Sequence, residues 1–137
     1  MKIVIIDGQG GKMGKSVIEQ LKKRFPELET YAIGTNSIAT SAMLKAGATY
    51  GATGENPVIV NAQDANIITG PIGIVMANSL LGEITPSMAA SIGSSKAYKI
   101  LIPVNRCNHY IVGCQNNTLS DYINMVCDEV GKEVKSI

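Results

Sequence analysis

The glycine-rich segment 8–14, "GQGGKMG", is the part of the sequence best suited to bind a ligand. It follows an apolar run that ends in Asp7, and Lys15 and Ser16 come directly after it. A glycine-rich turn between a strand and a helix can bring backbone N–H groups close to the phosphates of a nucleotide. Two known motifs have this character: the loop of ATP- and GTP-binding proteins, and the dinucleotide-binding turn of the Rossmann fold.

The spacing argues against the ATP or GTP loop. Its motif, G-x-x-x-x-G-K-[ST], counted back from the Gly-Lys-Ser ending, requires a glycine where the chain has Gln9. Such proteins also place an acidic residue at the end of a later strand to hold Mg²⁺. The strand expected at 66–70 ends in a glycine followed by Pro71, and the strand expected at 98–105 ends in Val-Asn. The loop therefore fails both tests of this motif.

The dinucleotide interpretation assigns a role to each glycine of the spacing G-x-x-G-x-x-G. Gly8 would make the tight turn, Gly10 or Gly11 would let a pyrophosphate approach, and Gly14 would let the helix pack on the strand. A strand-to-helix turn that binds nothing is the alternative. The complete loop resembles the G-A-x-G-R-M-G loop of dihydrodipicolinate reductases, and Gln9 departs from that pattern, as does Lys12.

One element of the NAD-binding pattern is missing from the expected position. NAD-binding folds place an acidic residue about 20 residues after the loop, where it binds the ribose 2′-hydroxyl. Here the second strand ends in the segment 34–37, "GTNS". Small hydroxyl and amide groups suit NADP somewhat better than NAD, and Lys12 would replace the usual arginine. The predicted cofactor is thus NADP or NAD, and an unrelated nucleotide or phosphorylated metabolite fits about equally well. The expected contact residues are Gly8, Gln9, Gly10, Gly11, Lys12, Met13, Gly14, Thr35, Asn36, Gly70 and Gly73.

Other polar residues are expected at the same edge, because ligands of open parallel sheets lie beyond the carboxyl ends of the strands. Arg106 could bind a phosphate or carboxylate through two parallel hydrogen bonds. The alternative is that Arg106 lies in solvent at the tip of a hairpin. Cys107 beside His109 could be a nucleophile and its base, but nothing there supplies an orienting acid. No spacing of ligand residues suggests a metal. The candidate substrate or ligand residues at this edge are Thr53, Glu55, Asn56, Asn105 and Arg106.

Composition restricts the function classes. The chain has 137 residues, a formal net charge of +1, one phenylalanine and no tryptophan, so nucleic-acid binding is not expected. The three cysteines form no C-x-x-C pair, and no signal peptide precedes the first strand, so a cytoplasmic protein is expected. The uncharged stretch 65–82 is interrupted by Gly-Pro, which favours a buried strand, a turn and a helix over a membrane span.

The central part of the chain carries few charges. Between Thr30 and Ser95 they are Lys45, Glu55, Asp64 and Glu83. Helices in such a segment cannot easily offer a solvated face. A sandwiched parallel-sheet core is one explanation, and burial against a second copy of the chain is the other, so a homo-oligomer is expected.

Hydrophobic patterning predicts one α/β domain over residues 1–137. Strands alternate with helices as far as 98–105, and a very short link to a further strand at 109–114 allows only a hairpin there. We therefore expect a Rossmann-like, mostly parallel sheet with helices on both faces and an antiparallel C-terminal hairpin at its edge. Strands are expected at 2–6, 30–36, 66–70, 98–105 and 109–114, with a short strand and a helix or extended connection within 47–65, and helices start near 12, 37, 85 and 118.

Several segments together resemble a family of small, uncharacterised bacterial proteins: "DGQGGKMGK", "GTNSIATSAMLKAGA", "GATGEN", "GPIGIVMANSLLGEITP" and "ILIPVNRCN". The resemblance implies a Rossmann-like fold without an established activity. Three hypotheses follow: a protein that binds or senses a nucleotide, most simply NAD(P); a small enzyme acting on a phosphorylated or carboxylated metabolite; and a structural protein with an empty glycine loop.

Overall fold

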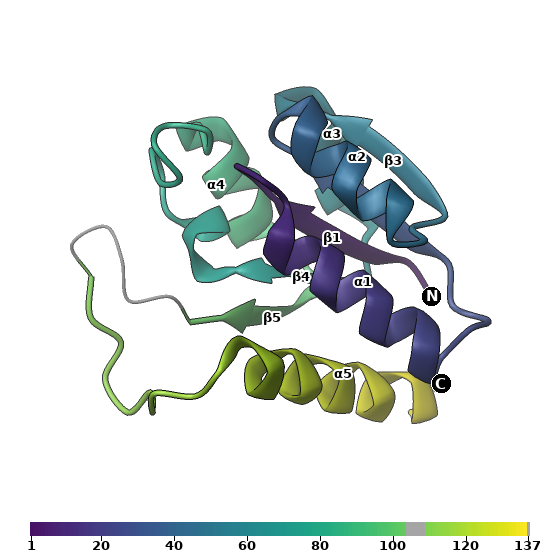
Figure 1. The fold of residues 1–137 in the computed structure, drawn as a ribbon. Helices are drawn as coiled ribbons and strands as arrows, with labels where there is room; N and C mark the ends of the chain where they lie inside the picture. The colour runs from purple at the N-terminus through teal and green to yellow at the C-terminus, as the bar shows by residue number, and fades with distance from the viewer. Residues whose placement is uncertain (104–108, 137) are drawn as a thin grey trace.

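The first strand, β1 (Ile3–Asp7), lies at the centre of a five-stranded parallel sheet in a computed structural model that describes residues 1–103 and 109–136 (Figure 1). The strand order is β3-β2-β1-β4-β5. All five residues of β1 are buried, as expected for a strand covered on both faces. The other strands are β2 (Thr30–Gly34), β3 (Tyr50–Thr53), β4 (Ile67–Pro71) and β5 (Tyr98–Ile102).

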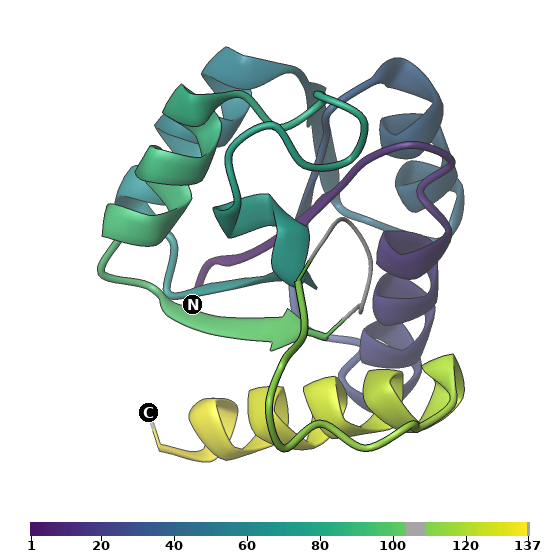
Figure 2. The same cartoon turned by 90° about the vertical axis from the view of Figure 1, so that its left-hand side faces the viewer.

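Helices cover both faces of the sheet, as predicted (Figures 1 and 2). Ile3 and Ile5 point into one core with α1, α2 and α5, while Val4 and Ile6 point into the other with α3, α4 and a short 3₁₀ helix, η1. This alternation follows from the period of two of a β-strand. The helices are α1 (Lys12–Arg24), α2 (Ser37–Lys45), α3 (Glu55–Asp64), η1 (Ile72–Val75), α4 (Pro86–Ser94) and α5 (Leu119–Lys135).

Three helices begin close to the starts expected at 37, 85 and 118, and each has a side-chain cap. Asn36 caps α2 by accepting a hydrogen bond from the Ala39 N–H. Thr85 caps α4, with Pro86 as its first residue, and Thr118 forms a capping box with Asp121 at the start of α5. These caps fix where the connecting loops end, and so fix the carboxyl edge of the sheet.

The predicted C-terminal hairpin is wrong. β5 pairs in parallel with β4, from Ile67 opposite Tyr98 onward, and residues 109–114 contain turns but no strand. Tyr110 and Val112 in that segment are 76% and 86% exposed, so no layer covers them. A short link permits a hairpin without requiring it, and α5 packs against the face of β5 instead.

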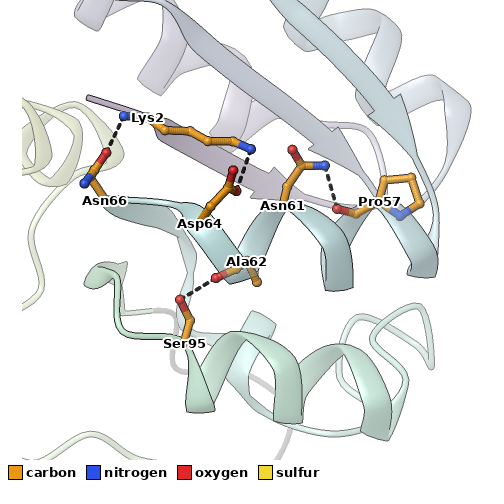
Figure 3. A network of polar contacts seen from close by, with 7 residues as sticks. All are labelled: Lys2, Pro57, Asn61, Ala62, Asp64, Asn66 and Ser95. Carbon is orange, nitrogen blue, oxygen red and sulfur yellow. Dashed lines mark hydrogen bonds and ion pairs between the residues drawn. The ribbon is translucent and has the colours of Figure 1, made fainter.

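The amino ends of the strands are fastened by polar contacts far from the candidate site (Figure 3). The Lys2 ammonium lies 2.7 Å from the Asp64 carboxylate, and the Lys2 N–H donates to the Asn66 side chain at 2.6 Å. The Ser95 hydroxyl donates to the Ala62 carbonyl at 2.6 Å, which joins α4 to α3. The stretch 65–82 contains β4 and η1, and no helix of the described residues is long and apolar enough to cross a membrane.

The strand order creates a topological switch point beside β1. The chain moves outward from β1 to β2 and β3, and then returns to place β4 on the other side of β1. The connections that follow β1 and β4 therefore leave the sheet in opposite directions, and open α/β sheets bind their ligands in a crevice at such a point. The glycine loop follows β1, and the loop 76–85 follows β4 and η1.

Candidate functional site

The Asp7 carboxylate accepts hydrogen bonds from the backbone of the glycine loop, residues 8–14. Asp7 ends β1, and its two oxygens accept hydrogen bonds from the N–H groups of Gly8 at 2.8 Å and Gly14 at 2.7 Å. Burial raises the pKa of Asp7 above its usual 3.8; the bonds from Gly14 and Gly8 oppose this rise, and the charge of Glu83 adds to it. A built-in carboxylate thus satisfies donors that an external phosphate would otherwise use at the start of α1.

The glycines of the loop differ in what surrounds them. Gly11 has a left-handed φ of +73°, and a Cβ there would lie 2.8 Å from the Ala39 Cα of α2. At Gly14 a Cβ would lie 2.5 Å from the Met43 sulfur of α2 and 3.0 Å from the Asp7 Cβ of β1, so this glycine allows α1 to pack closely on both. At Gly10 nothing lies within 4 Å of the Cβ position. Gly10 is therefore the open position of the loop, and Gly11 is a packing position.

Two N–H groups of the loop remain available. Within the described residues, the N–H groups of Gly10 and Lys12 donate no hydrogen bond, while Gly11 donates to the Gly8 carbonyl at 2.9 Å. Gly10 and Lys12 are both exposed. The loop therefore has two N–H groups without a hydrogen-bond partner among the described residues, both on exposed residues beside the first turn of α1.

Glu83, from the loop 76–85, joins the ends of β1 and β2. One of its oxygens, Oε1, accepts a hydrogen bond from the Gln9 N–H at 2.8 Å and another from the Asn36 side-chain amide at 2.9 Å. The Thr35 hydroxyl donates to the same oxygen. The Asn36 amide also donates to the Gln9 carbonyl at 3.0 Å. Three predicted site residues are thus brought together by a residue that the sequence did not single out.

Glu83 is held as a charged carboxylate. Burial alone would raise its pKa, but the hydrogen bonds from Thr35, from the Gln9 N–H and from Asn36 bring it below the usual 4.5. No described residue donates a hydrogen bond to the second oxygen, Oε2. The carboxylate is therefore fixed through one oxygen and has capacity to accept at the other.

The loop that carries Glu83 has an unusual backbone. Asn78, Leu80 and Leu81 have positive φ angles of 68°, 55° and 56°, which side chains larger than glycine rarely adopt. The buried Ser79 hydroxyl donates to the Gly73 carbonyl and ties the loop to η1. Such conformations cost about 1–3 kcal/mol each and cluster at functional sites.

Gly8 makes room for this loop. A Cβ on Gly8 would lie 2.6 Å from the Thr35 hydroxyl oxygen, 2.8 Å from Glu83 Oε1 and 3.0 Å from Leu80. A larger residue would therefore push Glu83 off the end of β1. The glycine allows the loop after β4 to approach the backbone closely.

The candidate ligand residues Thr53, Glu55 and Asn56 make no hydrogen bond with Glu83. Thr53 makes a 2.7 Å hydrogen bond with Thr40, and Glu55 accepts one at 2.6 Å from the cap residue Thr85. Asn56 is exposed near them. These contacts fasten α2 to β3 and α3 to α4.

Two predicted glycines serve packing. Gly70 lies in β4, where a Cβ would collide with the Ile6 carbonyl of β1, and Gly73 lies against Ser79. Both therefore allow close packing beneath the crevice. Asn105, Arg106 and the Cys107–His109 pair cannot be placed as a site, because 104–108 lie outside the described residues. Among the residues that are described, no group of three His, Cys, Asp or Glu side chains could hold a metal ion.

A groove of about 620 Å³ lies between α1 and α2, next to the site. Its lining includes Ser37, which directly follows Asn36. The lysines Lys15 and Lys45 give the lining positive charge, and it contains no acidic residue. It contains none of the residues that bind Glu83, so it is separate from the crevice. The lining residues are Lys15, Ser37, Ile38, Ser41, Ala42 and Lys45.

Sequence reasoning missed the two carboxylates of the site, although each left a signal. Asp7 is the one charged residue in an otherwise apolar strand and directly precedes the glycines. Glu83 is one of only four charged residues between Thr30 and Ser95. The charge pattern alone does not separate Glu83 from Lys45, Glu55 and Asp64, which lie away from the glycine loop.

The chain belongs to the family described as a domain of unknown function, DUF3842, which matches residues 2–135. A search of curated proteins found no match. Among solved structures, the fold is similar to that of a dodecameric FMN-dependent UbiX-like decarboxylase from Escherichia coli O157:H7. The TM-score is 0.55 at 13% identity, over 98% of this chain and 95% of that chain. At this identity the likeness shows a shared α/β fold and nothing further.

Proposed function

We propose that the protein binds a nucleotide of the NAD(P) type in the crevice between β1 and β4, as a binding or sensing domain. The observation that carries the proposal is the open position at Gly10, beside the two unused N–H groups of Gly10 and Lys12. They lie at the topological switch point, where open α/β sheets bind their ligands. The pyrophosphate would bind to these two groups.

The Asp7 carboxylate limits how the pyrophosphate can bind. It already accepts the Gly8 and Gly14 N–H groups, so the ligand would contact the exposed side of the loop instead of the whole start of α1. The exposed Lys12 ammonium can offset the negative charge of Asp7 there. This arrangement supports a ligand that approaches over Gly10.

FMN is the second ligand that we consider, because the similar decarboxylase is described as FMN-dependent. FMN carries one phosphate, and two free N–H groups suit a single phosphate as well as a pyrophosphate. A small enzyme built on Thr53 and Glu55 has less support, because both side chains bind neighbouring elements.

Thermal stability with a panel of NAD(H), NADP(H), FMN, ATP and S-adenosylmethionine tests the proposal. A ligand at 100 times its dissociation constant stabilises the protein by about 2.7 kcal/mol. Gly10→Val should abolish the shift, because its side chain would fill the open position. Gly93→Val is the matched control, since Gly93 in α4 also has nothing within 4 Å of its Cβ position. The absence of any shift at millimolar nucleotide would refute the proposal.

We further propose that the chain forms a homo-oligomer. Large apolar side chains are exposed on several elements, among them Ile38 of α2 at 69% and Val60 of α3 at 50%. Both belong to the charge-poor central part of the chain, which supports burial of these helices against another copy. Light scattering should give a mass above 14.5 kDa, the mass of one chain. A monomer at that mass would refute this part.

A further inference from the structure

A carboxylate lies beside the end of β2 in space, although no acidic residue directly follows β2 along the chain. NAD-binding Rossmann folds use an acidic residue at this point to bind the ribose 2′-hydroxyl. Here Thr35 and Asn36 follow β2, and both donate hydrogen bonds to Glu83. Glu83 is 47 residues further along the chain than Asn36, and it arrives from the loop after β4. The position of the missing acid is therefore filled from another part of the sequence.

The geometry of this carboxylate suits a ligand with hydroxyl groups. Thr35, Asn36 and the Gln9 N–H satisfy Oε1, and no described residue donates to Oε2. A charged carboxylate oxygen can accept two hydrogen bonds, so Oε2 can accept both hydroxyls of a vicinal diol. The three donors on Oε1 prevent the side chain from turning away from the ligand.

We infer that Glu83 Oε2 binds the free 2′- and 3′-hydroxyls of the adenosine ribose of NAD. NADP carries a phosphate on the 2′ position of that ribose, so Glu83 is the residue that selects NAD over NADP. The inference rests on the proposed function. A 2′-phosphate at this place would set a dianion beside the Glu83 carboxylate, with a second carboxylate, Asp7, close by. Thr35 and Asn36 taken alone favour NADP, and Glu83 reverses that preference.

An opposite role for Glu83 is physically reasonable and gives the opposite result. Its carboxylate could occupy the place of a ligand phosphate, held by the same three donors. Removal of the charge would then strengthen the binding of every phosphate-containing ligand. If Glu83 binds the ribose, removal of the charge weakens NAD and leaves NADP unchanged or stronger.

Isothermal titration of NAD and NADP into the wild-type chain, Glu83→Gln and Glu27→Gln separates the two roles. Wild type should prefer NAD at least tenfold. Glu83→Gln should lose roughly tenfold to a hundredfold in NAD affinity, the range expected for a hydrogen bond to a charged group. Its affinity for NADP should not fall. Glu27→Gln removes the same charge before the amino end of β2, where Glu27 is exposed, and should leave both affinities unchanged.

The outcomes distinguish this inference from the proposed function. Equal affinities, or tighter NADP binding, in the wild type would overturn the inference while the proposed site stands, and this comparison needs no variant. Stronger binding of both nucleotides by Glu83→Gln would also overturn it, in favour of an occupied phosphate site. If neither nucleotide binds the wild type, the NAD(P) proposal is wrong and the inference falls with it.

Discussion

An added methyl group should have opposite effects at the neighbouring residues Gly10 and Gly11. At Gly11 the backbone has φ +73°, and a Cβ would lie 2.8 Å from the Cα and 2.9 Å from the carbonyl oxygen of Ala39. Both contacts are with the backbone of α2, which cannot rotate away as a side chain can. At Gly10 nothing lies within 4 Å of the Cβ position, and φ is outside the left-handed region.

The magnitudes follow from these two environments. A left-handed residue other than glycine costs about 1–2 kcal/mol. Forcing a methyl group into a packed contact costs about 1–3 kcal/mol more. Gly11→Ala should therefore lower the free energy of unfolding by about 2–5 kcal/mol, a large share of the ~5–15 kcal/mol typical of a domain. Gly10→Ala should change it by less than 1 kcal/mol, with a small gain because the unfolded chain loses freedom.

Urea unfolding followed by far-ultraviolet circular dichroism measures both variants. The comparison is internally controlled, because the two substitutions are identical and adjacent in the sequence. The urea midpoint of Gly11→Ala should fall, while the slope of its transition stays equal to that of the wild type. If the two variants agree within about 0.5 kcal/mol, the contact between the loop and α2 is not as described.

Three further predictions concern the titration of the site, the C-terminal segment and the last helix. In a carboxyl-detected NMR titration, Asp7 should have its midpoint above 3.8 and Glu83 below 4.5. Because the pKa of Glu83 is lowered, its contribution to the free energy of unfolding is present above pH 4.5 and is lost as the pH falls through its folded-state pKa. Because the pKa of Asp7 is raised, its contribution is present below pH 3.8 and is lost as the pH rises through its folded-state pKa. Shifts in the reverse directions would contradict the bonds at Glu83 and the burial of Asp7. Val112→Ser should change stability by less than ~0.5 kcal/mol, because Val112 is 86% exposed, and a loss of about 1.5–3 kcal/mol would indicate a buried strand at 109–114 after all. Thr118→Ala should cost about 0.5–2 kcal/mol in thermal unfolding through loss of the α5 cap, against Ser120→Ala as a neutral control; equal stabilities would argue against the capping box.

The fold was largely predictable because local signals agree with one another. The apolar run of β1, the amphipathic pattern of α1 and the caps at Asn36, Thr85 and Thr118 each indicate the same α/β order. The hairpin was the exception, since its prediction relied on the length of a link. Whether a segment forms a strand depends on what covers it, and this is a tertiary property.

The candidate site could be predicted only in part. The glycine loop, Thr35 and Asn36 were found because they follow strands directly along the chain. Glu83 lies on a loop with three left-handed residues other than glycine, and no local pattern shows that such a loop turns back over β1. Its neighbours in space are set by the strand order, which places β4 beside β1. Contacts of this kind require the assembled sheet.

The hydrogen bonds of Glu83 also have a consequence for the order of folding. They join residues 74, 48 and 47 positions apart, so they can form only after β1, β2 and β4 have come together. Contacts between residues far apart in the sequence tend to form late in folding, so we expect the Glu83 carboxylate to be unpaired in the folding transition state. Glu83→Gln should then accelerate unfolding in a chevron experiment and leave the refolding rate unchanged. We therefore expect the contacts around Glu83 to be the last part of the molecule to form and the first to open.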